Sequence, residues 1–158
     1  MVAGATIRSP RAGRRPLLSS AAIVTICLLA TACSGESEPA GPTATPASAI
    51  DGELTVIASE WRFGPEGIVL EQGEEVRITL QNDGEIIHNL TVDDLQIDLI
   101  EDMGSGGFSA DDGELLVGAA SGDIGTITFI PLEPGKYVFF CSIGNHRQLG
   151  MEGRLIVE

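Results

Sequence analysis

A cysteine, a histidine and a methionine stand five residues apart in the stretch FFCSIGNHRQLGM, at Cys141, His146 and Met151. They offer a thiolate, an imidazole and a thioether, which are ligands for soft metal ions. Residues five apart do not share one face of a helix, and Gly144 and Gly150 disfavour a helix in this stretch. We therefore expect a loop that leaves a strand end and turns all three side chains inward.

A second imidazole can come only from His88, because the chain contains two histidines. His88 lies in IIHNL, on another expected strand. Two imidazoles and a thiolate in a plane, with a long axial methionine bond, form the ligand set of a blue-copper electron-transfer site. Structural zinc favours four Cys or His ligands, so a methionine fits zinc poorly. This donor set predicts one copper ion per chain, alternating between Cu(I) and Cu(II).

The first 32 residues have the layout of a secretory signal peptide. Four arginines precede an apolar run at 17–32, which is shorter than the roughly 20 residues that a membrane span needs. The run LATAC at 29–33 resembles a lipobox, in which the cysteine is acylated and becomes the new N-terminus. We therefore expect lipid attachment at Cys33; the alternative is an ordinary signal peptide that is cleaved near a cysteine.

Residues 33–49 are rich in Pro, Ser, Thr and Ala and show no apolar periodicity, so we expect a flexible tether. The mature protein is then exported and anchored to the outer face of the cell membrane, or is otherwise periplasmic or extracellular. With Cys27 removed and Cys33 acylated, Cys141 is the only thiol left. A lone cysteine in an oxidising compartment indicates a metal site or catalysis.

Removal of the signal peptide leaves five basic residues against 23 acidic ones, a difference of −18. This charge argues against nucleic acid or anionic lipid as a partner. A protein partner with a basic docking surface remains open. So does the simpler interpretation that the acidic residues keep an exported protein soluble.

The remaining segment, 50–158, has the size of one domain and is composed of short β segments separated by turn residues. The expected strands are residues 53–59, 67–71, 75–82, 86–92, 125–130, 136–141 and 154–158. Within the acidic, glycine-rich stretch 93–123, residues 95–103 are expected to form a strand or a helical turn, and residues 114–120 a further strand. The pattern predicts an all-β fold, an antiparallel Greek-key sandwich or barrel. Trp61 and Phe63 are expected in its core.

The stretch PLEPGKYVFFCSIGNHRQLGMEGRLIVE resembles the C-terminal third of a cupredoxin, the family of plastocyanin and azurin. The Pro-Gly turn, the aromatic strand, the Cys-x4-His-x4-Met loop and the closing strand match, and the loop spacing is nearest to rusticyanin-, auracyanin- and sulfocyanin-like members. As in the family, the first histidine is followed by asparagine, here Asn89. The stretch 93–123 is poorly matched.

The resemblance implies that Cys141 supplies the thiolate, His88 and His146 the equatorial imidazoles, and Met151 the axial bond. It implies that Asn89 braces the ligand loop from outside the ligand shell. The function expected is single-electron transfer between redox protein partners outside the cytoplasm, without enzymatic activity. Two alternatives stay open: a copper chaperone or storage protein, and a cupredoxin-like interaction domain without a redox role.

Overall fold

The computed structural model describes residues 45–111 and 113–158, and all structural statements below concern these residues. The predicted signal peptide, Cys33 and most of the predicted tether lie outside them. Over the same residues, no helix has the length and apolar character that crossing a membrane requires.

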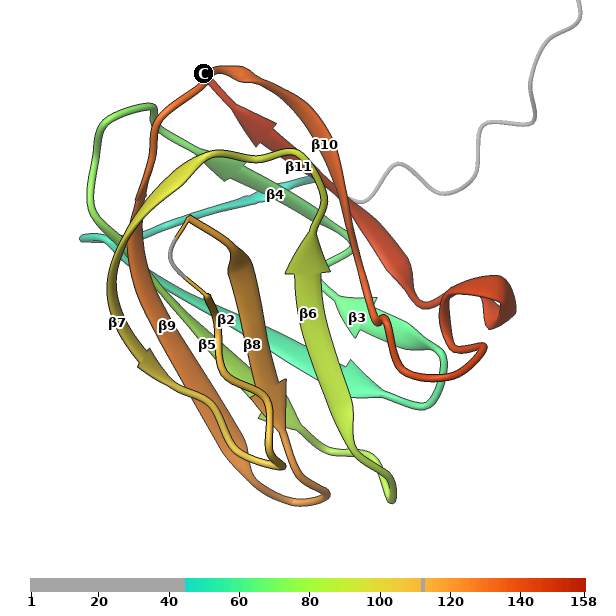
Figure 1. Cartoon of the computed structure of the whole chain (residues 1–158). Coiled ribbons are helices and arrows are strands. Elements are labelled where there is room, and N and C mark those ends of the chain that lie inside the picture. The colour runs from blue at the N-terminus through green and yellow to red at the C-terminus, as the bar shows by residue number, and fades with distance from the viewer. Residues whose placement is uncertain (1–44, 112) are drawn as a thin grey trace, which may run out of the picture. The chain divides into compact units, whose positions relative to one another are not determined.

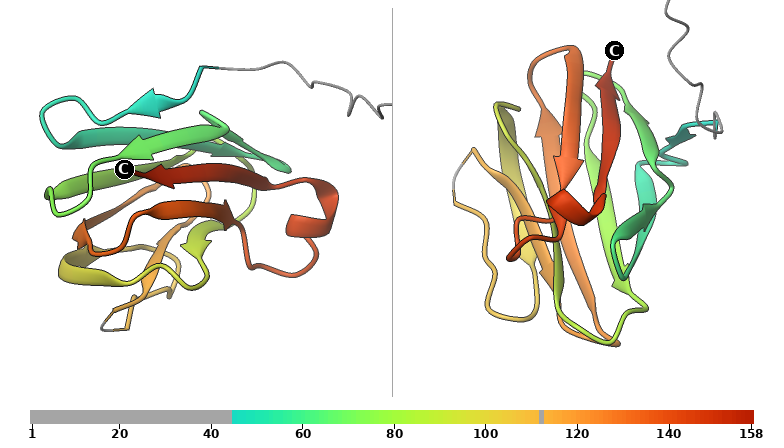
Figure 2. Two further views of the ribbon diagram at one scale, coloured as in Figure 1. Left: turned by 90° about the horizontal axis from the view of Figure 1, so that it is seen from above. Right: turned by 90° about the vertical axis from the view of Figure 1, so that its right-hand side faces the viewer.

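Eleven strands form two sheets that face one another as the layers of a sandwich (Figures 1 and 2). One sheet has the order β1-β4-β11-β10-β6-β8 and the other the order β3-β2-β5-β9-β7. The strand bounds are β1 Ala47–Ser48, β2 Glu53–Ser59, β3 Arg62–Gly64, β4 Gly67–Leu70, β5 Val76–Asn82, β6 His88–Val92, β7 Ile97–Met103, β8 Leu115–Ala119, β9 Ile124–Pro131, β10 Gly135–Phe140 and β11 Glu152–Val157.

The predicted all-β sandwich is confirmed, although the strand pairing is mixed rather than wholly antiparallel. Strand β2 pairs with β5 in parallel, and β4 pairs in parallel with both β1 and β11. The hairpin β10–β11 and the pairs β6–β8, β5–β9 and β7–β9 are antiparallel. Parallel neighbours cannot be joined by a tight hairpin, so the chain crosses between the sheets, as a Greek-key arrangement requires.

The core lies between the sheets and is built by residues that alternate with exposed ones along each strand. In β2 the burial alternates from Leu54 to Ala58, and β11 shows the same period of two. Phe63 and Phe139, one from each sheet, pack edge to face with ring centroids 5.3 Å apart. Each such buried ring stabilises the fold by about 1.5–3 kcal/mol through apolar burial. The prediction that Phe63 belongs to the core is confirmed, at 2% exposed.

Both segments for which the sequence predicts regular structure within 93–123 contain strands. Strand β7 lies at the edge of its sheet against β9, and a register shift between Leu99 and Glu101 interrupts the pairing. Strand β8 pairs with β6 along its whole length, from His88 opposite Ala119 to Val92 opposite Leu115. The stretch 93–123 therefore supplies β8, the strand that covers the edge of β6, on which His88 lies.

The domain begins slightly earlier than the sequence predicts. Ala47 and Ser48, at the end of the predicted tether, pair with Ile68 and Val69 of β4, and Ala47 and Ala49 pack against the core. The boundary at residue 50 therefore lies inside an ordered edge of the sheet. The short strand β3 was also missed, because three residues carry too little periodicity to detect.

Candidate metal centre

The predicted ligands lie where strand β6 begins and strand β10 ends. His88 is the first residue of β6, and Cys141 directly follows β10. The two strands are antiparallel neighbours, with Phe139 opposite Val92 and Phe140 opposite Thr91. The sheet therefore fixes the distance between the first histidine and the cysteine, although 53 residues separate them in the sequence.

The other donors come from the loop that joins β10 to β11. This loop contains a 3₁₀ helix of three residues, Arg147–Leu149, but no α-helix, and it turns at Gly144 and Gly150 with φ of 52° and 101°. Such left-handed backbone favours glycine. The Cys141 N–H donates to the Met151 carbonyl and the Met151 N–H donates to the His146 carbonyl, each at 3.1 Å. The loop thus folds back on itself and closes at the cysteine.

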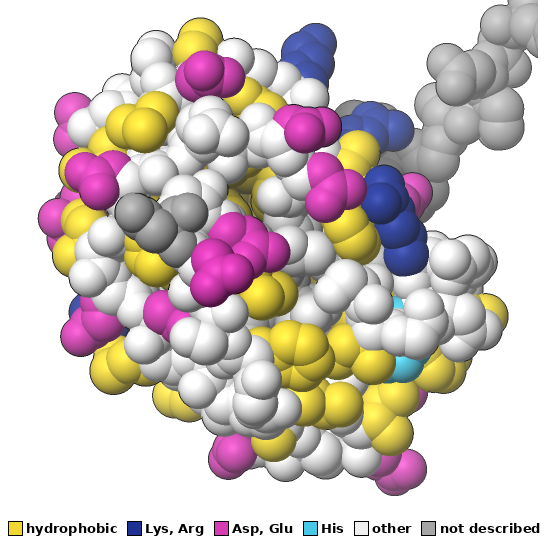
Figure 3. Space-filling view, viewed as in Figure 1, with side chains coloured by type: hydrophobic (Ala, Val, Ile, Leu, Met, Phe, Trp, Pro, Cys, Tyr) yellow, Lys and Arg dark blue, Asp and Glu magenta, His cyan; other side chains and the backbone are white. Residues whose placement is uncertain are grey.

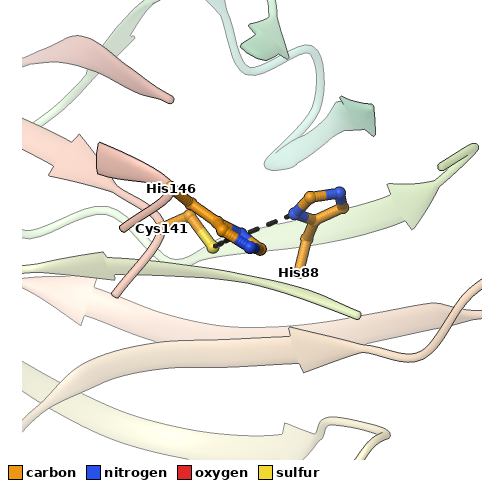
Figure 4. Close-up of side chains that lie close together, drawn as sticks. All are labelled: His88, Cys141 and His146. Carbon is orange, nitrogen blue, oxygen red and sulfur yellow. Dashed lines mark hydrogen bonds between the residues drawn. The ribbon is translucent and has the colours of Figure 1, made fainter. Parts of the chain in front are cut away.

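Figure 4 shows the two imidazoles and the thiol facing a common point. The Cys141 Sγ lies 3.9 Å from the His88 Nδ1 and 3.3 Å from the His146 Nδ1. One donor atom from each of the three residues lies within 4.8 Å of the others. Exposed fractions are 0% for His88, 1% for Cys141 and 6% for His146, and Met151 is 0% exposed in the same core.

These separations fit one trigonal metal ion. With metal–sulfur and metal–nitrogen bonds of about 2.3 and 2.0 Å, as in zinc sites, sulfur and nitrogen in a trigonal plane stand about 3.7 Å apart. The observed 3.9 and 3.3 Å lie on either side of that value. Both imidazoles present Nδ1, the atom that must be unprotonated to bind. The four side chains match a single type 1 copper site.

Burial sets the protonation of the metal-free site. It lowers the pKa of His88, an effect that the nearby His146 reinforces and Glu60 opposes. It raises the pKa of the Cys141 thiol, against weaker hydrogen bonds from the backbone of Asn89 and Ile143. His88 is therefore neutral and ready to bind, whereas the thiol keeps its proton until a metal ion displaces it.

Asn89 clamps the ligand loop to strand β6. Its side-chain oxygen accepts a hydrogen bond from the Ser142 N–H, and its amide donates to the Ser142 hydroxyl, both at 2.8 Å. The Asn89 side chain is fully buried whereas Ser142 is exposed, so these bonds are shielded from water on the Asn89 side. The bracing role of Asn89 stays a prediction, and these two bonds are the contacts through which it would act. Ser142 was missed because a serine after the cysteine carries no signal of its own.

Trp61 is not in the core, and this sequence prediction was wrong. The residue lies in the turn between β2 and β3, is 38% exposed, and packs edge to face on His146 with ring centroids 4.7 Å apart. An alternating pattern places Phe63 inward but cannot place a residue of the turn. Arg147 was also missed; it stacks on Phe140 at 3.9 Å and pairs with Glu152 at 3.2 Å, which holds the loop from outside.

One imidazole reaches the surface. Of the two imidazoles only that of His146 is exposed, at 6% against 0% for His88. Figure 3 shows a small area of histidine on this face of the molecule, beside apolar side chains. Trp61, which contacts His146, and Leu149 of the same loop are 38% and 47% exposed. The site is therefore closed to water on the His88 side and nearly closed, under an apolar cover, on the His146 side.

Comparison with known proteins identifies a domain family and solved structures of similar fold. The family model of the cupredoxin-like domain matches residues 21–157. Similar solved structures include a dithionite-reduced auracyanin from the photosynthetic bacterium Roseiflexus castenholzii (TM-score 0.53, 19% identity, 68% of this chain and 97% of that one) and auracyanin B (0.52, 20%, 73% and 91%). A multicopper oxidase also matches (0.53, 18%, 68% and 44%). No curated protein sequence matches the chain.

The raised pKa of the Cys141 thiol predicts pH-dependent metal uptake. Binding at pH 7–8 expels one proton from the thiol and none from the neutral His88, so the apparent Cu(I) affinity should rise about tenfold per pH unit. Competition titrations can follow it through the fluorescence of Trp61, the only tryptophan. In Cys141→Ser the affinity should be far weaker and the slope lost. An affinity independent of pH in the native domain would contradict a protonated thiol.

Proposed function

Because the chain belongs to the cupredoxin-like domain family, we propose that it is a type 1 copper protein that carries single electrons between redox partners outside the cytoplasm. The convergence of His88, Cys141 and His146 in a buried site is the observation that carries the proposal. When bound, copper supplies a one-electron couple between Cu(I) and Cu(II). His88, Cys141 and His146 would hold the ion through two imidazoles and a thiolate, and Met151 would add a weak thioether donor.

The protein's own residues do three things in this function. The sheet and the Asn89–Ser142 clamp keep the donors at fixed separations, so a change of charge causes little movement. Burial excludes water, whose reorientation would add to the cost of moving an electron. His146 is the most exposed of the four donor residues, at 6%, and its edge is where an electron would enter or leave.

An enzymatic role has less support. The oxidase that matches is more than twice as long as the region shared with this chain, which spans 44% of it. Both histidines of the given sequence lie in the one site, so it has none left for a second copper cluster. A copper-storage role would call for several exposed methionine sulfurs. Met151 is buried, and Met103, at 52% exposed, is the only other methionine that the structure describes, so this role is disfavoured.

The location and partners are proposed from the sequence. We infer export through the signal peptide at 1–32, a lipid anchor at Cys33 on the outer face of the membrane, and a tether that begins at the anchor. The excess of 23 acidic over five basic residues in the mature chain favours a redox protein with a basic docking surface. The same charge disfavours nucleic acid.

The purified domain with Cu(II) should be intensely blue or green, because a cysteine thiolate bound to Cu(II) gives a strong charge-transfer absorption. Cys141→Ala should abolish this band, since Cys141 is the only free cysteine among the described residues. Visible absorption spectroscopy checks both outcomes. A colourless copper complex of the native domain would exclude the blue-copper function.

Met151 should adjust the reduction potential rather than determine whether copper binds. An axial thioether bond is long and weak, so most of the affinity comes from the three donors in the plane. Met151→Gln offers a harder oxygen that favours Cu(II) and should lower the potential, whereas Met151→Leu removes the donor and should raise it. Both variants should keep the thiolate absorption. Equal potentials in all three proteins would mean that Met151 only packs the core.

Full-length protein should fractionate with membranes, because a diacylglyceryl cysteine supplies the two acyl chains that stable anchoring needs. Cys33→Ser should release the protein or leave its signal peptide uncleaved. Fractionation and mass spectrometry of the mature N-terminus test this. An unmodified N-terminus away from residue 33 would rule out the anchor.

A further inference from the structure

The outer nitrogen of His88 has no hydrogen-bond partner among the described residues, although it is buried. Its Nδ1 faces the Cys141 sulfur, so when Nδ1 binds the metal the proton must sit on Nε2. Buried N–H groups are almost always paired, because an unpaired one loses its hydration without compensation. The acidic group that faces this nitrogen is the Glu60 carboxylate, with Oε1 3.9 Å from Nε2.

Glu60 reaches this position through an unusual turn. It lies between β2 and β3, next to Trp61, which has φ of 66° in the left-handed region. A bulky side chain is sterically disfavoured there, and such outliers cluster where function requires them. As a result, two successive side chains face the two imidazoles: Glu60 faces His88, and Trp61 contacts His146.

The neighbouring loop between β5 and β6 holds the carboxylate. Glu60 Oε1 accepts a hydrogen bond from the Glu85 N–H at 2.6 Å. The buried Asn82 amide fixes this loop by donating to the Ile86 and Ala119 carbonyls at 2.8 and 2.9 Å. A backbone N–H of a fixed loop thus holds the carboxylate beside the histidine.

Gly84 has no side chain, and this leaves space for the Glu60 carboxylate to approach the His88 imidazole. A Cβ at this position would lie 2.6 Å from the Glu60 Oε1 and 3.1 Å from the His88 Nε2. No real side chain tolerates the first distance, and the flexible end of Glu60 is the part that could move. An alanine at this position would therefore push the Glu60 carboxylate away from the imidazole.

We propose that Glu60 is a positioning residue of the metal centre, whose carboxylate is the anionic partner of the His88 Nε2–H group and favours Cu(II) over Cu(I). This inference rests on the proposed copper function. At 3.9 Å the contact is longer than a hydrogen bond, so it acts as an attraction between a charge and an N–H dipole. Carboxylates behind ligating histidines fix the ring and make it a stronger donor. Because Glu60 is 39% exposed, solvent moderates the effect.

The main test compares reduction potentials. Glu60→Gln removes the charge and keeps the shape, and the ratio of Cu(II) to Cu(I) affinity should fall by about tenfold, a rise of about 59 mV for one electron. Gly84→Ala keeps the charge but displaces the carboxylate, so the potential should rise by a smaller amount. Glu85→Gln is the matched control: it removes a neighbouring charge, keeps the N–H that Glu60 accepts, and should change the potential least.

A second measurement needs no copper. Nitrogen NMR of the metal-free protein reports which ring nitrogen of His88 carries the proton. The native protein should hold it on Nε2, and Glu60→Gln and Gly84→Ala should both increase the share of the other tautomer, whereas Glu85→Gln should not.

Equal potential shifts in Glu60→Gln and Glu85→Gln, or an unchanged His88 tautomer in Glu60→Gln, would overturn the inference, because only general surface charge would then be at work. Absence of a thiolate absorption in the native copper protein would instead refute the proposed function. The tautomer measurement would still decide whether Glu60 positions His88.

Discussion

The structure depends on holding three polar donors close together inside an apolar core. A thiol and two imidazoles lie within 4.8 Å of one another, at 6% exposure or less. Buried polar atoms are costly unless they are paired, and the separations suit a metal ion better than direct hydrogen bonds, since one sulfur–nitrogen distance is 3.9 Å. The rest of the fold keeps these donors in place: neighbouring strands β6 and β10 set one distance, and a loop that closes on Cys141 sets the other.

The two imidazoles have opposite surroundings, and this asymmetry divides their roles. His88 is fully enclosed, with β8 covering its strand and Glu60 facing its outer nitrogen. His146 lies under Trp61 and touches the surface. The His88 side is the one that we propose sets the electrostatic balance between oxidation states, and the His146 side is the proposed route for electrons to and from a redox partner. The turn that carries Glu60 and Trp61 adjoins both sides.

The sequence predicts the sandwich and the ligand set well because both have strong local signals. Alternation along β2, β5 and β11 follows from burial of one face, and the spacing of Cys141, His146 and Met151 places rare donor types in one loop. The parallel pairings, the exposed Trp61 and the contact between Glu60 and His88 could not be predicted. Each depends on which distant segments meet, and neither alternation nor spacing within one segment specifies such long-range contacts.

X-ray absorption at the copper edge of the native domain, recorded in both oxidation states, tests the central claim most directly. We expect one short copper–sulfur bond and two copper–nitrogen bonds from imidazoles. Their lengths should change little between Cu(I) and Cu(II), because the sheet and the Asn89–Ser142 clamp fix the donors before metal binds. A first shell of nitrogen and oxygen only, or a change in the number of ligands on reduction, would contradict a preformed trigonal site.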